Sequence, residues 1–256
     1  MAGITQHDAI AEAMRRLGGF ATLSQLYSTA TKVSGSEWHA KNPFATIRGR
    51  LQDKPHLFFK IRPGQWGLVA QKDRILEQLD LSPTTPAEQR QRTQHAWYQS
   101  LAVRLGNLNG FRTHVPPSDL NKTFQDRQTL RSIVTDVGVP SFSFDTITER
   151  ANNVDVSWFN GDDLPHAFIE IEYSPEYRRS LSKYVVLRAF FSQFIIVADE
   201  NQDRAFKEMI KAKEWESICQ DPYGKTYDRV RFWSFEDLAQ RLETAERVRA
   251  EQESTR

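Results

Sequence analysis

The chain has 256 residues, of which 39% are apolar and 26% are charged, and its formal net charge is +1. These values are typical of a globular protein and exclude a disordered or fibrous chain. No apolar run is long enough to span a membrane, the N-terminus lacks a signal-peptide core, and the single cysteine, Cys219, suits a reducing compartment, so we expect a cytoplasmic protein.

Charge is unevenly distributed along the chain. The first 70 residues carry nine Lys and Arg against four Asp and Glu, a net charge of +5, whereas the remainder is mildly acidic. A basic module joined to a near-neutral one predicts that the first part contacts a polyanion.

The first 70 residues show helix signals followed by a hairpin signal. Helices are predicted over residues 4–17, 23–27 and 43–52, with Thr5 and Asn42 as N-caps and Pro43 in the first turn of the third helix. Strands are predicted over residues 57–61 and 65–69, joined by a turn that contains Pro and Gly. Three helices and a hairpin predict a winged helix-turn-helix.

This segment resembles the HARE-HTH family of winged-helix modules. The resemblance is carried by the Gly18-Gly19 break, the NPFATIRGRL segment and the FFKIRPGQWGL wing. It implies DNA contact and sensing of modified DNA. The third helix would enter the major groove, and the wing would touch phosphates. The residues predicted to make these contacts are Asn42, Thr46, Arg48, Arg50, Lys60 and Arg62. Two alternatives stay open: the charges solvate one face of the module, or the module docks a protein.

Residues 71–93 are predicted to be a linker between two domains. Ser82-Pro83-Thr84-Thr85-Pro86 breaks any helix there, and a polar Gln/Arg run follows. A helix over residues 94–105 then opens a second domain, expected to cover residues 94–247, and a charged tail over residues 248–256 is expected to fray.

Acidic residues mark a predicted hairpin in the second domain. Asp155 lies in a short apolar run, a polar turn follows, and the second strand carries Glu170 and Glu172 on one face because side chains alternate with period two. Buried carboxylates are costly unless they are paired or bind a cation. Three of them converging would suit Mg²⁺, which prefers oxygen ligands. The alternative is an edge hairpin whose outward face happens to be acidic.

Residues 125–240 resemble the PD-(D/E)XK nuclease superfamily. The Asp is Asp155 and the Glu is Glu170, but Glu172 stands where Lys is usual. The resemblance implies a mixed sheet flanked by helices, which together with the winged helix gives an α+β/α/β chain. It also implies Mg²⁺, replaceable by Mn²⁺, held by Asp155, Glu170 and the Ile171 carbonyl. Glu172 would orient or deprotonate the attacking water.

Helices on either side of the hairpin supply further candidate residues. Glu149 precedes the Asp155 strand and would add a carboxylate, although a solvated helix end is the alternative. A helix predicted to begin at Ser174-Pro175-Glu176 places Arg179 and Lys183 one turn apart, near enough to approach a scissile phosphate, or else on a solvated face. Strands at 194–198 and 229–233, with helices at 201–213 and 235–247, complete the predicted layer.

The resulting hypothesis is a restriction-type endonuclease that hydrolyses double-stranded DNA and defends against foreign DNA. Cutting both strands would favour a homodimer, although no interface is evident in the sequence. Two alternatives remain: a non-catalytic DNA-binding regulator with an inactive nuclease-like domain, and a protein-interaction module. The sequence holds no phosphate-binding Gly-rich loop, no HExxH and no Gly-x-Ser-x-Gly, which argues against other enzyme classes.

Overall fold

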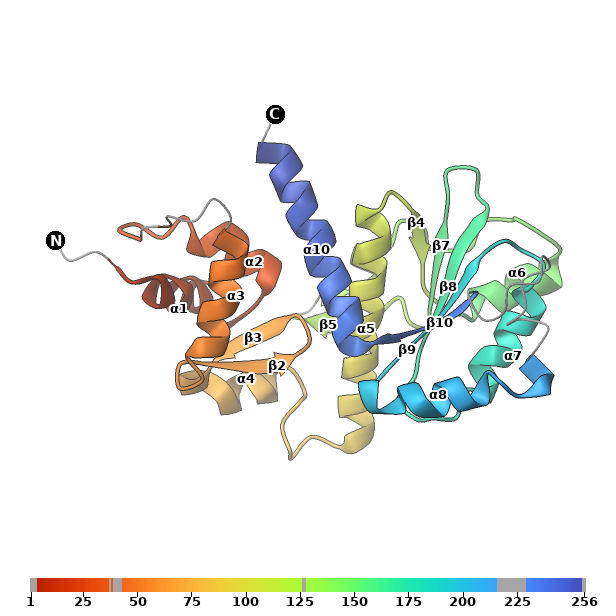
Figure 1. The fold of residues 1–256 in the computed structure, drawn as a ribbon, viewed down its shortest axis with the longest axis horizontal. Coiled ribbons are helices and arrows are strands. Elements are labelled where there is room, and N and C mark those ends of the chain that lie inside the picture. The colour runs from red at the N-terminus through yellow and green to blue at the C-terminus, as the bar shows by residue number, and fades with distance from the viewer. Residues whose placement is uncertain (1–3, 37, 39–42, 126–127, 216–228, 255–256) are drawn as a thin grey trace. The chain divides into compact units, whose positions relative to one another are not determined.

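A computed structural model describes residues 4–36, 38, 43–125, 128–215 and 229–254. Asn42 and Cys219 lie outside these ranges. The chain divides into two compact units, each described by itself (Figure 1): an N-terminal unit of Met1–Arg90 with Glu243–Arg256, and a C-terminal unit of Gln91–Leu242. No helix within the described ranges is long and apolar enough to cross a membrane.

The N-terminal unit combines helices with a small antiparallel sheet. Its elements are α1 (Gln6–Arg16), β1 (Phe20–Thr22), α2 (Leu23–Ala30), α3 (Pro43–Asp53), β2 (Phe58–Arg62), β3 (Gln65–Leu68) and α4 (Lys72–Gln78), and the sheet order is β1-β3-β2. The Thr5 side chain caps α1 as predicted, and Thr22 forms a capping box with Gln25 at the start of α2. Ile10, Leu26 and Leu51 are fully buried where the three helices meet.

The predicted linker is largely helical. Residues 72–78 form α4, and α5 (Ala87–Leu108) begins well before residue 94. Ile75 and Leu79 are buried against Phe20, which ties α4 to the small sheet. The N-terminal unit therefore extends past residue 70. The sequence pattern did not indicate the apolar contact between α4 and the small sheet that causes this extension.

The C-terminal unit is built on a mixed five-stranded sheet flanked by helices, as predicted. The strand order is β10-β9-β8-β7-β4. The pairs β4–β7 and β7–β8 are antiparallel, whereas β8–β9 and β9–β10 are parallel. Its strands are β4 (Arg112–His114), β7 (Val156–Phe159), β8 (Pro165–Ile171), β9 (Gln193–Ala198) and β10 (Val230–Ser234), with β5 (Thr123–Gln125) and β6 (Gln128–Thr129) forming a separate hairpin. Its remaining helices are α6 (Asp145–Asn152), α7 (Arg178–Leu187), α8 (Asp203–Met209) and the first part of α10 (Phe235–Ser254), whose residues from Glu243 onward belong to the N-terminal unit.

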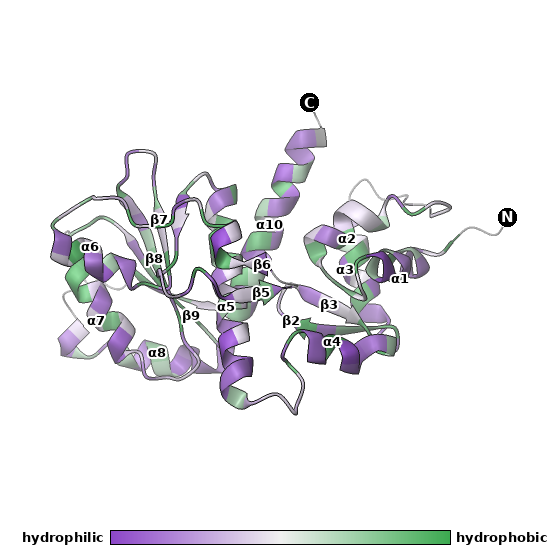
Figure 2. Cartoon of the chain, turned by 180° about the vertical axis from the view of Figure 1, so that it is seen from behind, coloured by the Kyte–Doolittle hydropathy of each residue, from purple (hydrophilic) through white to green (hydrophobic). Residues whose placement is uncertain are grey.

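The two faces of this sheet have different helical partners. Phe168, Phe194 and Ile196 are buried in one core with side chains from α6, α7 and α8. On α5, the Ala102 carbonyl accepts a hydrogen bond from the Trp158 indole at 3.2 Å. The helices carry both hydrophobic and hydrophilic residues (Figure 2), consistent with one face packed on the sheet. Glu170, two residues after Phe168 on β8, consequently points to the α7 side.

Three further predicted helix boundaries were wrong. Helix α7 begins at Arg178, because buried Tyr177 occupies the N-cap position and its hydroxyl bonds the Gln202 side chain at 2.9 Å. Helix α8 ends at Met209 and not at residue 213. Helix α10 continues to Ser254, so the expected frayed tail is helical there, with an Arg249–Glu253 pair at 3.0 Å one turn apart.

Candidate active site

The β7–β8 hairpin positions Asp155 beside β8. The turn is closed by the Asn160 side chain, which accepts hydrogen bonds from two backbone N–H groups of residues 162 and 164. Val156 pairs with Ile169 in the ladder, and Asp155 lies one residue before β7. The backbone N–H of Ile171 donates to Asp155 Oδ2 at 2.8 Å. Asp155 is therefore held by the strand that carries Glu170.

Glu170 is the most deeply buried carboxylate of the predicted trio, with 3% of the residue exposed. Lys183 on α7 donates to both of its oxygens at 2.8 Å and to the backbone carbonyl of Asn153 at 2.7 Å. The Ser180 hydroxyl lies 3.3 Å from Glu170 Oε2 and also hydrogen-bonds Glu172 Oε1. One turn of α7 thus supplies a cation to Glu170 and a hydroxyl that reaches both glutamates.

A second set of residues, absent from the sequence prediction, reaches Asp155: two side chains of α5 and Asp119 from the turn after β4. His95 Nε2 lies 3.2 Å from Asp155 Oδ2, and His95 Nδ1 lies 3.1 Å from Gln99 Oε1. The Gln99 amide nitrogen donates to Asp119 Oδ2 at 2.8 Å and to the backbone carbonyl of Asp155 at 3.0 Å. His95, Gln99 and Asp119 together are called the α5 arm below. It holds both the main chain and the carboxylate of Asp155.

The hydrogen-bond pattern of the α5 arm fixes the protons on His95. Both partners of the Gln99 nitrogen are oxygens that only accept, so the Gln99 oxygen must be the atom facing His95 Nδ1, which donates to it. Asp155 Oδ2 also accepts, so His95 Nε2 donates as well. With both ring nitrogens protonated, His95 is an imidazolium beside the Asp155 carboxylate.

The pKa shifts follow from burial and charge. Burial lowers the pKa of His95, but its bond and attraction to Asp155 outweigh burial and raise it overall. For Asp155, burial raises the pKa, yet His95, the Ile171 N–H and Lys183 together bring it below its ordinary value. Burial and then repulsion from Asp155 raise the pKa of Glu170 well above its ordinary value, and burial likewise raises that of Glu172.

The spacing of possible cation ligands differs from the predicted trio. Within the described ranges, ligand atoms of His95, Asp119 and Asp155 all lie within 4.8 Å of one another. Glu170 and Glu172 interact with Asp155 electrostatically but are not part of that compact set. The hydrogen bonds that reach the Asp155 carboxylate go to Oδ2. Oxygen ligands with buried surroundings suit a hard divalent cation. Asp155 belongs both to the predicted trio and to this compact set.

Two other residues predicted near this site lie on exposed surface. Glu149 is exposed on α6, and among the described residues no hydrogen bond or ion pair joins its carboxylate to the cluster. Arg179 is exposed on α7, one residue from buried Ser180. Lys183, in contrast, turns inward, so the helix brings only one of its two predicted cations to the carboxylates.

The residues predicted to contact DNA in the N-terminal unit have varied surroundings. Arg48 on α3 lies 3.4 Å from Glu243, and Arg50 donates to Gln6 at 3.2 Å. Thr46 is half-buried and Lys60 is exposed. Arg62 is only 5% exposed and donates to Gln65 at 2.8 Å, so burial removes it from the predicted surface contacts. Asn42 lies outside the described residues.

Comparisons with known proteins assign this chain to a family. The family model for the Type II restriction enzyme NmeDI C-terminal domain matches residues 78–255. Type II restriction enzyme NmeDI of Neisseria meningitidis serogroup C is 30% identical over 124 residues, which are 44% of this chain and 35% of that protein. The alignment thus spans about a third of the relative's length. No solved structure gives a significant match. On the extent of the family match, the chain belongs to the Type II restriction enzyme NmeDI C-terminal domain family.

Proposed function

We propose that this chain is a metal-dependent DNA endonuclease of restriction type, with its active centre at Asp155 and Glu170. The observation that carries the proposal is the convergence of the buried Glu170 carboxylate on β8 and the half-buried Asp155 carboxylate just before β7 with the Lys183 ammonium from the following helix. The PD-(D/E)XK arrangement requires such a hairpin followed by a helix, and the mixed sheet order agrees with it. Membership in a restriction-enzyme domain family supports DNA as the substrate.

Asp155 would be the principal ligand of a divalent cation. Glu170 and the Ile171 carbonyl would complete the site on the β8 side, and Asp119 offers a further carboxylate on the other side. The doubly protonated His95 would stay an outer partner of Asp155, because an imidazolium has no lone pair for a cation. A bound Mg²⁺ or Mn²⁺ would polarise the phosphoryl group and lower the pKa of a water. The chain's own residues prepare this site by fixing Asp155 before any cation arrives.

Each neighbouring residue has a distinct role in this proposal. The α5 arm positions Asp155, as outer-shell partners do for metal ligands in general. Lys183 supplies the positive charge that the Glu-x-Glu pattern lacks at residue 172, and it neutralises Glu170 or the phosphate. Glu172, whose pKa is raised, accepts the proton of the attacking water, and Ser180 orients its carboxylate.

The N-terminal unit would contribute DNA binding as a winged helix of the HARE-HTH type. Its helices α1, α2 and α3, followed by the β2–β3 hairpin, occur in the order that such a domain requires. Arg50 and Lys60 are exposed, and Thr46 and Arg48 lie on α3 with them. Contacts from α3 would read bases in the major groove, including modified ones, and Lys60 would contact a phosphate.

A specific observation supports a second candidate, a non-catalytic DNA-binding regulator. Both oxygens of Glu170 and one of Asp155 are already engaged by the chain's own donors. An inactive nuclease relative would keep such internal pairs in place of a cation. The two candidates differ in one measurable property. In the endonuclease, Mg²⁺ or Mn²⁺ would replace some of these internal donors at the carboxylates, whereas in the regulator the internal pairs would stay.

The test is digestion of matched methylated and unmethylated DNA by the full chain with Mg²⁺ or Mn²⁺. Asp155→Ala and Glu170→Ala should each abolish cutting, whereas Asp162→Ala, an exposed acid in the same hairpin, should cut like the wild type. Glu149→Ala decides whether that helix-end carboxylate participates. Undiminished cutting by Asp155→Ala or Glu170→Ala would reject the active centre, and no cutting by the wild type on either DNA would favour the regulator. The mass of the complex with DNA would show whether two copies act together.

A further inference from the structure

The lysine that pairs with Glu170 has no hydrogen-bond donor left for a substrate. An ammonium group has three N–H donors, and Lys183 directs them to both oxygens of Glu170 and to the backbone carbonyl of Asn153. Only 12% of the Lys183 side chain is exposed. Lys183 therefore neutralises Glu170 within the chain, and a phosphate at the carboxylates needs a different cation.

A second lysine lies on the other side of Asp155. Lys122 Nζ is 2.6 Å from Asp119 Oδ1, and the charge of Lys122 also acts electrostatically on His95. Ligand atoms of Asp119 and Asp155 lie within 4.8 Å of each other. Two ammonium groups thus flank Asp155, one from α7 through Glu170 and one from the turn after β4 through Asp119.

Lys122 keeps the hydrogen-bonding capacity that Lys183 lacks. Within the described part of the chain, the ion-pair partner of its ammonium group is Asp119 alone, so the other N–H donors stay available. The Lys122 side chain is 36% exposed, against 12% for Lys183. An ammonium group on a flexible four-carbon side chain is a common phosphate contact. Lys122 can therefore bind a phosphate without giving up its pair with Asp119.

The main chain around Lys122 is already fixed by hydrogen bonds and burial. Its N–H donates to the Asp119 carbonyl at 2.8 Å, and its carbonyl accepts from the Leu130 N–H at 3.1 Å. Leu120 and Phe124, two residues before and after it, are both buried. Only the end of the side chain has to move to meet a substrate, which keeps the entropic cost of the contact small.

The charges of the centre nearly balance without a metal. Its three cations are His95, Lys122 and Lys183, and its four carboxylates are those of Asp119, Asp155, Glu170 and Glu172. Burial raises the pKa of both glutamates, which reduces their negative charge. A DNA phosphate can therefore approach Lys122 in the absence of a divalent cation.

We propose that Lys122 binds a phosphate of the DNA strand at the active centre. This inference rests on the proposed endonuclease function and assigns separate tasks to the two lysines. Lys183 balances the buried Glu170 inside the chain, whereas Lys122 directs its remaining N–H donors to the substrate beside Asp155.

The first experiment measures binding of a fluorescein-labelled DNA duplex of mixed sequence to the full chain in EDTA, where a metal-dependent nuclease does not cut. Lys122→Gln should weaken binding about tenfold or more and reduce the slope of log affinity against log salt by about 1, because one phosphate contact is lost. Lys122→Arg keeps the positive charge and should retain the slope of the wild type.

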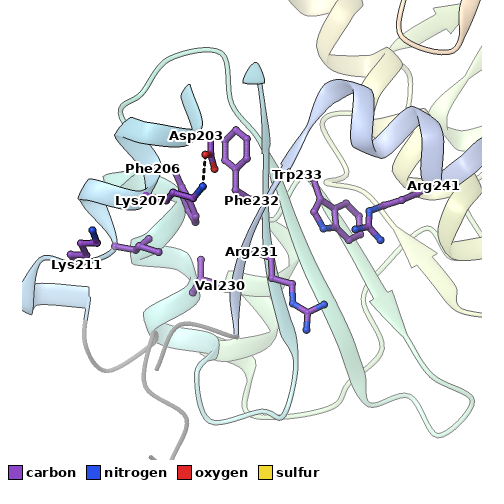
Figure 3. Close-up of a pocket in the computed structure, with 10 residues that line it drawn as sticks. Asp203, Phe206, Lys207, Lys211, Val230, Arg231, Phe232, Trp233 and Arg241 are labelled. Carbon is purple, nitrogen blue, oxygen red and sulfur yellow. Dashed lines mark hydrogen bonds and ion pairs between the residues drawn. The ribbon is translucent and has the colours of Figure 1, made fainter. Parts of the chain in front are cut away.

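Lys207 on α8 provides a matched control. It also pairs with an aspartate, Asp203 at 2.5 Å, and this pair is drawn beside β10 in Figure 3. Strand β10 and strand β4, which precedes Lys122 in the chain, are at opposite edges of the five-stranded sheet. Lys207→Gln should therefore leave both the affinity and the salt slope of the wild type unchanged.

The second experiment uses the wild-type chain and separates a DNA contact from mere support of Asp119. Lysines are acetylated by an N-hydroxysuccinimide ester in EDTA, with and without saturating duplex, and the modified peptides are quantified by mass spectrometry. Acetylation of Lys122 should fall when DNA is added, whereas that of Lys207 should not. A lysine that only supports Asp119 would react equally in both samples.

Either experiment can overturn the proposal. An unchanged salt slope in Lys122→Gln would do so, and so would equal acetylation of Lys122 with and without DNA. A reduced slope in Arg179→Gln, together with an unchanged slope in Lys122→Gln, would assign the phosphate contact to the exposed face of α7 instead.

These outcomes are separable from the fate of the proposed function. Protection of Lys122 by DNA without any metal-dependent cutting would reject the endonuclease and retain Lys122 as a DNA contact. Cutting that depends on Asp155, with an unchanged salt slope in Lys122→Gln, would retain the endonuclease and reject this role of Lys122.

Discussion

Ser180→Ala probes the charge arrangement of the site with the smallest change in volume. The hydroxyl is fully buried and hydrogen-bonds both glutamates, although one O–H can donate to only one of them at a time. A hydrogen bond to a charged group contributes about 1.5–3 kcal/mol. We therefore expect Ser180→Ala to lower the free energy of unfolding by about that amount at neutral pH.

Helix α7 provides a matched control two residues away. The exposed Ser182 hydroxyl donates to the backbone carbonyl of Arg178 at 2.7 Å, and Ser182→Ala should change stability by less than about 0.5 kcal/mol. Urea unfolding of both variants and the wild type, without divalent metal, measures the difference. Equal effects of the two substitutions would refute the assigned role of Ser180.

The cost of Ser180→Ala should also depend on pH with a defined sign. The hydroxyl stabilises the ionised form of Glu172 and so opposes the upward shift of its pKa. Removing it raises that pKa further. The destabilisation should therefore be greatest at high pH, where Glu172 is ionised, and should shrink as the pH falls and the carboxylate takes up a proton. A pH-independent cost would mean that the hydroxyl acts only through packing.

Three further predictions concern other parts of the chain. Gln99→Leu should weaken Mn²⁺ binding about 10- to 100-fold, because the α5 arm no longer fixes Asp155. Calorimetry without DNA measures the affinity, and a value within twofold of the wild type would contradict that role. Lys183→Met should raise the pKa of Glu170 still further and move half-maximal Mn²⁺ binding to higher pH, since the cation that favours the carboxylate is gone; an unshifted binding profile would exclude this coupling. Lys60→Gln should weaken DNA binding uniformly across sequences and reduce the salt slope by about 1, whereas a change in sequence preference would argue against a phosphate contact.

Local patterns predicted most elements of the fold. Period-two alternation placed Glu170, on β8, on the same side as Glu172, which follows that strand, and Ser180 from α7 hydrogen-bonds both carboxylates. The Thr5 cap and the β2–β3 hairpin are also where turn and capping chemistry indicated. These features depend on residues close together in the sequence, which is why sequence reasoning reaches them.

The α5 arm could not be predicted because it joins distant segments. His95 and Asp155 are 60 residues apart, and Gln99 and Asp119 are 20 apart. The available signal in the sequence was weak. It consisted of two polar residues, His95 and Gln99, one turn apart on a predicted helix among apolar residues. The inward turn of Lys183 and the burial of Arg62 likewise depend on packing, which charge patterns along the chain do not reveal.

The most direct test of the account is calorimetric titration of the metal-free full chain with Mn²⁺, with unfolding monitored in parallel. We expect one saturable site that Asp155→Ala abolishes and Glu170→Ala weakens, with uptake accompanied by proton release because Glu170 begins with a raised pKa. Wild-type Mn²⁺ affinity in a folded Asp155→Ala chain, or no uptake by the wild type, would contradict the central claim.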